Sequence, residues 1–314
     1  MKSETGTNKA KKNNILFGEY KKHADLMLMF LPGLILLIIF KYIPLGGVTL
    51  AFKDYVVSDG ILGSRWVGME HFSRLFAGED FLHVLKNTLV ISLLKLILGF
   101  PLPIILALLL NEVRSVKFKK TVQTMSYLPY FFSWIVFAGI ISMLFSTRGP
   151  VNALLMKFGF SKPLEFYADG KLFISLLIIS AMWQGTGWSA VIFLASVSGI
   201  SEDLYEAARI DGAGRWRQTL SITIPCLVPT IVTVFILNLG SVMNAGFDQI
   251  YNMYNPVVYD VSDIIDTYVL RRMQGMDYSL STAAGLFKSV VTFVLMIISN
   301  WAVGKMSDNE LGIW

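Results

Sequence analysis

The sequence predicts an all-α, polytopic membrane protein with six transmembrane helices. Of its 314 residues, 54% are hydrophobic and only 16% are charged, and the mean hydropathy is +0.58. These values are typical of proteins that cross a membrane several times, and they exclude a soluble globular domain. Six long apolar segments alternate with polar ones, and no internal repeat divides the chain, which predicts a single membrane domain.

The first two spans are both interrupted by proline. A polar segment, residues 1–25, holds six lysines and is expected to be a cytoplasmic tail. The first span covers residues 26–50, where two prolines and a lysine predict a kink or an early end. The second covers residues 84–112, where Pro101 and Pro103 break the ladder of backbone hydrogen bonds, so neighbouring helices must cover the freed carbonyls.

The third span is long and uncharged. Residues 121–147 carry no charge over 27 residues, and as one helix they would be about 40 Å long. That exceeds a hydrocarbon core of about 30 Å, so we expect a tilted helix or one that extends past the membrane. The remaining spans are placed at residues 172–198, 226–247 and 281–304. The membrane domain then covers residues 26–305, with a C-terminal tail at 306–314.

The distribution of basic residues predicts the orientation. Six spans place both termini on one side of the membrane. With the N-terminus inside, the inner segments hold 14 lysines and arginines, whereas the outer segments hold nine although they are longer. By the positive-inside rule, we expect both termini in the cytoplasm.

Residues 201–225, between the fourth and fifth spans, form a charged insert between two long uncharged segments. Seven charges in this stretch require it to lie in water. Ser201 is a suitable N-cap, and the acidic residues after it suit a helix N-terminus. Gly212 and Gly214 supply the positive φ of a sharp turn, and Pro225 suits the first turn of the next span. We therefore expect two short helices joined by a glycine turn on the cytoplasmic side.

Two small residues on the first of these helices allow two interpretations. Ala207 and Ala208 could let the helix sink into a groove on another protein, with Glu206 and the arginines pairing at the rim. The alternative is a solvated loop in which the alanines only favour helix formation.

Recognisable enzymatic motifs are missing. The sequence has no G-x-x-x-x-G-K-[ST] phosphate loop, no nucleophile elbow and no metal-ligand spacing among its three histidines. The single cysteine, Cys226, excludes an intrachain disulfide, and we expect it to be a small packing residue. If ATP drives this protein, another subunit hydrolyses it.

Uncharged polar side chains in the fourth and fifth spans are candidates for a substrate path. On one helix, spacings of three, three and four residues would place the fifth-span group on one face. Amide, hydroxyl and indole groups suit a sugar, although such groups also join helices at about 0.6 kcal/mol per hydrogen bond. The candidates are Trp183, Gln184 and Trp188 in the fourth span, and Asn238, Ser241, Asn244 and Asp248 in the fifth.

Two lysines are each alone in a span. Lys95 and Lys288 could mark a path for an acidic substrate, or they could snorkel or pair with another subunit. The polar loop before the sixth span contains an amphipathic segment, residues 264–272. It could form a rim for a binding protein, or it could lie on the bilayer surface.

The stretch at residues 201–225 resembles the EAA loop of ABC importer permeases. That loop usually ends in leucine followed by proline, and in this sequence Ile224 stands in place of the leucine, before Pro225. Further segments extend the resemblance over nearly the whole chain after the tail, among them residues 42–45, 51–55, 66–68, 87–89, 99–112, 127–129, 265–268 and 278–287. Together they resemble the LplB/YteP-type permeases of polysaccharide and oligosaccharide importers, a branch of the maltose-type (type I) permeases. The resemblance assigns ATPase coupling to Glu206, Ala207, Ala208, Asp211, Gly212, Gly214, Ile224 and Pro225.

The resemblance implies a type I ABC importer permease fold in a bacterial cytoplasmic membrane. This chain would form the path for oligosaccharides with a second, similar permease, and an extracytoplasmic binding protein would deliver them. A cytoplasmic ATPase dimer would use ATP and Mg, so we expect this chain to bind no cofactor or nucleic acid and not to be an enzyme. Two alternatives stay open: an ABC permease for a non-sugar solute, and a membrane enzyme or scaffold without transport.

Overall fold

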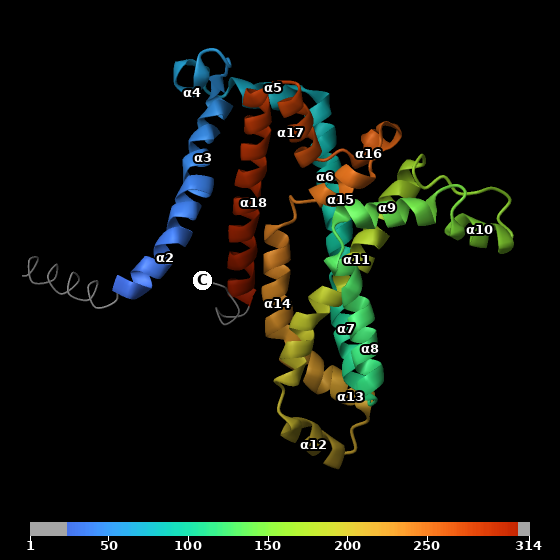
Figure 1. Ribbon diagram of the computed structural model, residues 1–314. Helices are drawn as coiled ribbons and strands as arrows, with labels where there is room; N and C mark the ends of the chain where they lie inside the picture. The colour runs from blue at the N-terminus through green and yellow to red at the C-terminus, as the bar shows by residue number, and fades with distance from the viewer. Residues whose placement is uncertain (1–23, 307–314) are drawn as a thin grey trace, which may run out of the picture. The chain divides into compact units, whose positions relative to one another are not determined.

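The computed structural model describes residues 24–306, and its elements are almost all helices (Figure 1). Six helical segments are long and apolar enough to cross a membrane, so the predicted all-α class and the predicted number of spans are confirmed. Of the two predicted tails, residues 1–23 and 307–314 lie outside the described residues. The six segments are Asp25–Phe52, Glu79–Glu112, Trp134–Lys157, Gly170–Ser198, Arg215–Gly240 and Tyr278–Lys305.

The chain divides into two units, Met1–Gly68 and Met69–Trp314. In the first unit, a two-stranded antiparallel sheet follows the span, with Lys53 opposite Trp66. The span itself loosens into a π-helical turn directly before Pro44, where the Ile43 N–H donates to the Ile38 carbonyl. The elements are α2 (Ala24–Leu37), η1 (Ile38–Tyr42), α3 (Ile43–Leu45), η2 (Gly46–Phe52), β1 (Lys53–Asp54), α4 (Gly60–Gly63) and β2 (Arg65–Trp66).

The second unit holds the other five candidate spans. Its first half consists of α5 (Glu70–Ala77), α6 (Glu79–Gly99), α7 (Pro101–Glu112), α8 (Val116–Tyr127), η3 (Leu128–Phe131), α9 (Trp134–Phe145), α10 (Pro150–Lys157) and α11 (Gly170–Ser198). Its second half consists of α12 (Glu202–Ile210), α13 (Arg215–Gln218), η4 (Thr219–Thr223), α14 (Ile224–Gly240), α15 (Phe247–Met253), η5 (Pro256–Val258), α16 (Tyr259–Ser262), α17 (Ile265–Gln274) and α18 (Tyr278–Met306).

Helix α11 is central to the second unit and packs against α6, α7, α8 and α14. Its fully buried Phe173 and Leu177 belong to an apolar cluster that also includes residues from α6, α9 and α15. Helix α8 approaches α11 closely at Gly187, where a Cβ would come within 1.9 Å of the Ser126 carbonyl oxygen. Only a glycine fits this helix crossing without a shift of the backbone.

Two of the predicted spans are wrong in their extent. Residues 121–147 do not form one tilted helix, because α8 ends at Tyr127, the 3-10 turn η3 contains Pro129, and α9 begins only at Trp134. Pro129 lacks the N–H that a continuing helix needs. The fifth span begins earlier, at Arg215, and α14 ends at Gly240 rather than near residue 247.

Cys226 also differs from the prediction. Its side chain is exposed in this chain and is not a packing residue of the core. By contrast, the predicted interruption of the second span is present, since α6 ends at Gly99 and α7 begins at Pro101.

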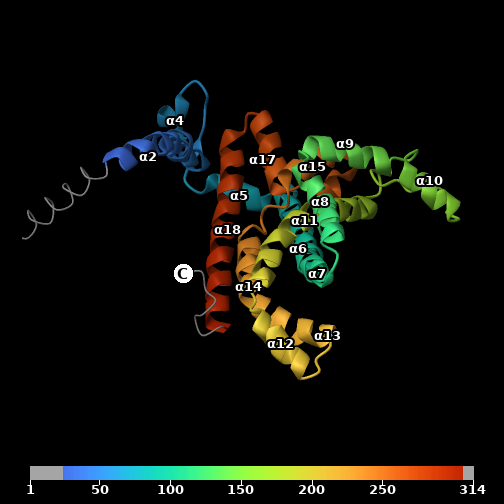
Figure 2. The ribbon, with the colours of Figure 1, turned by 60° about the horizontal axis from the view of Figure 1, so that its bottom comes forward.

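The second unit has two ends that are formed by different helices. Helices α12 and α13 lie at one end, and α5, α16 and α17 lie at the other (Figures 1 and 2). The long helices α6–α7, α11, α14 and α18 run between these ends.

Candidate functional site

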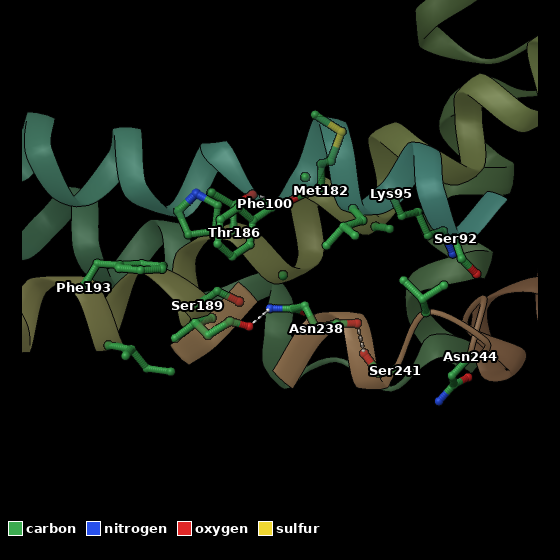
Figure 3. Close-up of a pocket in the computed structure, with 18 residues that line it drawn as sticks. Ser92, Lys95, Phe100, Met182, Thr186, Ser189, Phe193, Asn238, Ser241 and Asn244 are labelled. Carbon is green, nitrogen blue, oxygen red and sulfur yellow. Dashed lines mark hydrogen bonds between the residues drawn. The ribbon is translucent and has the colours of Figure 1, made fainter. Parts of the chain in front are cut away.

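A cavity of about 420 Å³ lies between α6, α7, α11 and the end of α14 (Figure 3). Its size suits a small-molecule site. Apolar walls, among them Phe100 and Phe193, are combined with hydroxyl, amide and ammonium groups. The polar lining residues are Ser92, Lys95, Thr186, Ser189, Asn238, Ser241 and Asn244.

Lys95 lies at one end of this cavity, on α6. Its ammonium donates to the Ala245 carbonyl at 2.6 Å and to the Gln249 side-chain oxygen. Gln249 is itself held from the other side, because its amide donates to the Leu177 carbonyl at 2.7 Å and to Ser180 Oγ at 2.8 Å. Lys95 therefore connects α6 to the segment after α14 through neutral acceptors.

Three of the four predicted fifth-span path residues line the cavity, but not as one helical face. Asn238 lies on α14, Ser241 follows its last residue, and Asn244 lies in the turn beyond (Figure 3). Asp248 is on the separate helix α15 and is not a lining residue. The expected single helix face is wrong, and the role of these residues in a substrate path stays a prediction.

The predicted fourth-span residues lie elsewhere. Trp188 stacks on Tyr130 with ring centroids 4.9 Å apart, and Gln184 donates to the Phe132 carbonyl at 3.1 Å. Trp183 packs against Phe137. Trp188 and Gln184 thus contact the broken segment between α8 and α9, and Trp183 contacts α9 itself. None of the three lines the cavity of Figure 3. Their proposed contact with substrate stays a prediction.

The charged stretch folds as the sequence predicts, into the two short helices α12 and α13. Ser201 caps α12 by accepting from the Asp203 N–H at 3.3 Å. At the other end, Gly212 has φ +77°, the Ala213 N–H donates to the Ala208 carbonyl, and the Gly212 N–H donates to the Arg209 carbonyl. This pattern is a Schellman motif, which ends the helix and requires the left-handed residue.

The second glycine of the turn behaves differently. Gly214 has φ −69° and precedes α13 in an extended conformation, so the predicted positive φ at this position is wrong. Ile224 and Pro225 begin α14, as expected, but a π-helical turn, η4, joins α13 to α14 without a break. The Ile224 N–H donates to the Thr219 carbonyl. This wider turn accommodates the missing N–H of Pro225.

The elbow formed by α12 and α13 (residues 202–218) is attached to the spans by a few polar contacts. The Tyr205 and Thr223 hydroxyls are 2.9 Å apart, and Arg215 lies 3.8 Å from Glu112 at the end of α7. Both partners of that ion pair are largely exposed, so its contribution to stability is small. Glu206, Ala207 and Asp211 are exposed and Ala208 is half-buried, which leaves this face of the elbow accessible.

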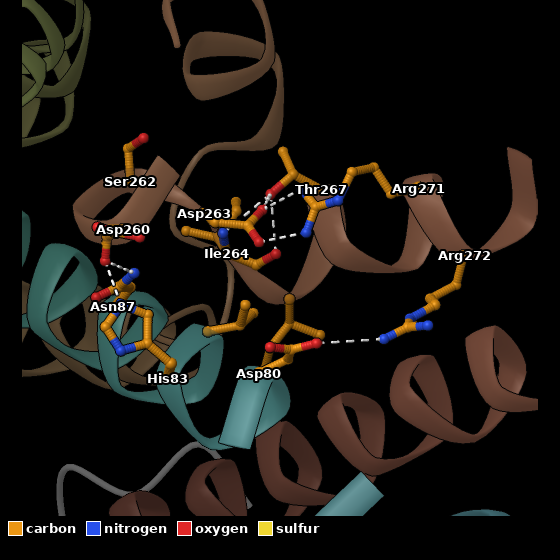
Figure 4. Close-up of polar contacts among 12 residues, drawn as sticks. Asp80, His83, Asn87, Asp260, Ser262, Asp263, Ile264, Thr267, Arg271 and Arg272 are labelled. Carbon is orange, nitrogen blue, oxygen red and sulfur yellow. Dashed lines mark hydrogen bonds and ion pairs between the residues drawn. The ribbon is translucent and has the colours of Figure 1, made fainter. Parts of the chain in front are cut away.

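A polar network at the opposite end was not predicted from the sequence. The Asp263 carboxylate accepts from Thr267 Oγ1 at 2.6 Å and from both terminal nitrogens of Arg271 (Figure 4). This hydrogen bonding to Asp263 raises the pKa of Arg271 above its usual value. We call these three residues the Asp263 network. Their spacing of four residues was a readable signal, because it places all three on one face of a helical segment.

Neighbouring contacts attach this end to α6. His83 contacts the Asp260 carbonyl, Asn87 donates to the same oxygen at 2.9 Å, and Arg272 lies 3.6 Å from Asp80 (Figure 4). The apolar face of the amphipathic segment is buried in the protein, with Ile264 and Ile265 fully covered. The segment is thus an integral part of the second unit.

These features together are those of a membrane permease: apolar spans around a polar cavity, with a charged elbow at one end. Residues 99–308 match the family described as "Binding-protein-dependent transport system inner membrane component". The chain belongs to that family, and its type I ABC permease fold is confirmed.

Two curated relatives from Bacillus subtilis (strain 168) are similar over most of the chain. The polygalacturonan/rhamnogalacturonan transport system permease protein YteP is 42% identical over 288 residues, which cover 91% of this chain and 89% of that protein. Protein LplB is 42% identical over 294 residues, which cover 92% and 91%. The resemblance inferred from the sequence is therefore confirmed.

Two solved structures share the fold. One is a crystal structure of a bacterial ABC transporter involved in the import of the acidic polysaccharide alginate. A chain of it has a TM-score of 0.85 and 38% identity, covering 91% of this chain and 97% of that one. The other is a bacterial alginate ABC transporter in complex with alginate pentasaccharide-bound periplasmic protein. Its matching chain has a TM-score of 0.86 and 37% identity, covering 95% and 99%.

Proposed function

We propose that this chain is one permease subunit of an ATP-driven importer that moves oligosaccharides across the bacterial cytoplasmic membrane. A second permease would complete the path, and an extracytoplasmic protein would deliver the sugar. The observation that carries this proposal is the cavity of Figure 3, whose hydroxyl and amide groups suit sugar hydroxyls. The names of the similar B. subtilis permease and of the alginate importers support the sugar class.

The elbow at residues 202–218 is the proposed contact with a cytoplasmic ATPase dimer. Its exposed face, the capped helix α12 and the rigid Schellman turn at Gly212 give a surface that a partner can push without unfolding it. Because η4 joins α13 directly to α14, a displacement of the elbow would pass into the fifth span. Asn238, near the end of that span, and Ser241, directly after it, line the cavity.

The transport cycle would then be one of alternating access. Closure of the ATPase dimer around ATP and Mg displaces the elbow, and the spans rock so that the cavity opens outward to the binding protein. Hydrolysis in the ATPase returns the cavity to the cytoplasmic side. In this arrangement the chain holds no cofactor, and both of its termini lie in the cytoplasm.

Uptake by cells that carry the complete importer tests the proposal. Glu206→Ala removes a charge from the accessible face of α12, so we expect uptake to fall at least tenfold while the protein stays in the membrane. Glu165→Ala, in the exposed segment before α11, is the matched control and should leave uptake unchanged. Normal uptake by Glu206→Ala would contradict the coupling role.

The same cells separate the remaining possibilities. Uptake of a peptide or amino acid, with no uptake of any oligosaccharide, would replace the sugar by another solute. A purified complex that contains no ATPase would instead indicate an enzyme or scaffold without transport.

A further inference from the structure

Two lysines inside the spans have opposite electrostatic surroundings. On α18, Lys288 Nζ lies 2.6 and 2.7 Å from the two carboxylate oxygens of Asp266, so its charge is neutralised within the chain. Lys95 on α6 has no such partner: within residues 24–306, no carboxylate oxygen lies within 4.0 Å of its ammonium. Its acceptors are the Ala245 carbonyl and the Gln249 amide oxygen, both neutral.

A purely structural role does not require the charge of Lys95. A neutral amide side chain could donate to Ala245, and Gln249 is already fixed through Leu177 and Ser180. A charged group in a membrane span is unfavourable unless it is paired or faces a wet cavity. The cavity of Figure 3, which Lys95 lines, is the accessible side of this ammonium.

The surroundings leave space and a second donor beside this charge. Gly246 has φ +91°, and a Cβ there would come within 2.9 Å of Lys95 Nζ, so the absent side chain leaves room for the ammonium. Ser92 lies one turn before Lys95 on the same face of α6 and lines the same cavity. Its Oγ is buried and has no hydrogen-bond partner among the described residues.

The ammonium also has hydrogen-bonding capacity left. A lysine side chain carries three N–H donors, and two acceptors for them are present within residues 24–306. A carboxylate offers two oxygens that could accept from the third N–H and from the Ser92 hydroxyl, and hydrogen bonds between ionised groups are stronger than neutral ones.

We propose that Lys95 and Ser92 form a carboxylate-binding subsite in the cavity, and that the permease selects acidic oligosaccharides built of uronate sugars. The inference rests on the proposed transport function and names its substrate class. Asn238, Ser241 and Asn244, which line the same cavity, then serve the neutral hydroxyls of the same sugar. Lys95 is the residue that distinguishes an acidic sugar from a neutral one.

The first test joins substrate to protein chemically. The complete purified importer is incubated with trigalacturonate or trimannuronate and a water-soluble carbodiimide. The carbodiimide activates the carboxylate, an amine attacks it to form an amide without a spacer, and the urea leaves. Mass spectrometry then locates the adduct. We expect labelling of Lys95 by at least one oligouronate, its loss in Lys95→Gln, and none with the methyl ester. Labelling confined to surface lysines would overturn the subsite.

The second test measures selection. In cells whose only oligosaccharide importer is this one, Lys95→Gln should lower oligouronate uptake at least tenfold, since a charge-assisted hydrogen bond is lost. Lys95→Arg should recover part of that uptake, and Ser92→Ala should lower it to a smaller extent. Lys288→Gln should lower the amount of folded importer instead, without changing the uptake per folded complex.

The outcomes separate this inference from the proposed function. If Lys95→Gln transports oligouronates normally, or if the wild type transports neutral oligosaccharides and neither oligouronate, the acidic class is wrong and the sugar importer stands. If no ATPase purifies with the chain, the transport function itself fails, whichever residue the carbodiimide labels.

Discussion

The Lys288 ammonium on α18 holds both oxygens of Asp266 on α17, at 2.6 and 2.7 Å. The two residues are 22 positions apart, and each side chain is only about a fifth exposed. The pair therefore fixes the amphipathic helix before the sixth span onto that span. Its near burial makes either charge unfavourable without the other.

Removal of one partner of this pair should destabilise the protein. Loss of a partner from a fully buried pair costs about 3–5 kcal/mol, and for this partly exposed pair we expect about 2 kcal/mol from Lys288→Met. The apparent melting temperature of the purified complex should fall by about 4–8 °C. The double variant Lys288→Met, Asp266→Asn should recover more than half of that loss, because no unpaired charge remains. An equal loss in both would show that the unpaired charge of Asp266 is not the cause of the destabilisation.

The close crossing of α8 and α11 predicts a strict requirement for glycine at position 187. A Cβ there would lie 1.9 Å from the Ser126 carbonyl oxygen, so Gly187→Ala must push the two helices apart. Overpacking of this kind costs about 1–3 kcal/mol. Gly185→Ala, two residues earlier on the same helix, has nothing within 4 Å and serves as the control. In thermal unfolding, the melting temperature of Gly187→Ala should be lower than that of the wild type, and the melting temperature of Gly185→Ala should be equal to it or higher.

The Schellman turn predicts that Gly212→Val impairs coupling more than stability. Valine is β-branched and disfavours φ +77°, so the turn should open and misplace α12. Oligosaccharide uptake and sugar-stimulated ATP hydrolysis by the complete importer should both fall at least tenfold. Gly159→Val imposes a similar strain, at φ +97°, in the segment between α10 and α11, and it should leave both activities intact. Equal effects of the two substitutions would argue against a special role for the elbow.

Tyr254 predicts a change in stability at high pH. Burial, together with the neighbouring Tyr259, raises the pKa of its phenol from 10.0 to about 12. Between these two values the native state binds more protons than the unfolded state. The stabilisation from this group is thus complete below pH 10 and is lost as the pH rises through 12.

A titration of tyrosinate absorbance, taken as the difference between the wild type and Tyr254→Phe, should show a midpoint near pH 12. Tyr259→Phe should lower that midpoint, because it removes one of the causes of the raised pKa. A midpoint near pH 10 in the wild type would mean that Tyr254 is solvated.

The sequence predicted the helical class, the number of spans and the charged elbow, because these depend on local composition and on capping residues. The structure confirms the capping serine, Ser201, and the left-handed Gly212. It does not confirm a positive φ at Gly214, since a glycine allows such a conformation without requiring it.

The predicted bounds of the third and fifth spans were wrong where the hydrophobicity of the sequence does not change at the end of a helix. Residues 121–147 are uncharged throughout, so only Pro129 marked the break that the structure has between α8 and α9. Gly240 marked the end of α14 in the same way. Because α14 ends there, Asn238 and Asp248 lie on different helices. Both signals were present, because proline and glycine interrupt or end helices.

Contacts between distant segments could not be predicted from the spacing of residues. The bonds from Lys95 to Ala245 and Gln249 join positions 150 and 154 residues apart. The pairing of Lys288 with Asp266 was likewise hidden, because it depends on how α17 folds back on α18. The cavity exists only once these helices are packed together.

The contact of the elbow with an ATPase is tested most directly by crosslinking Ala207→Cys in a Cys226→Ser background, where the introduced thiol is the only one in the chain. In closed cells that carry the whole importer, a thiol-to-lysine crosslinker should join this position to the ATPase subunit, and a membrane-impermeant maleimide added outside should not react. Labelling from outside, or the absence of any crosslink to an ATPase, would contradict the proposed coupling of this permease to ATP hydrolysis.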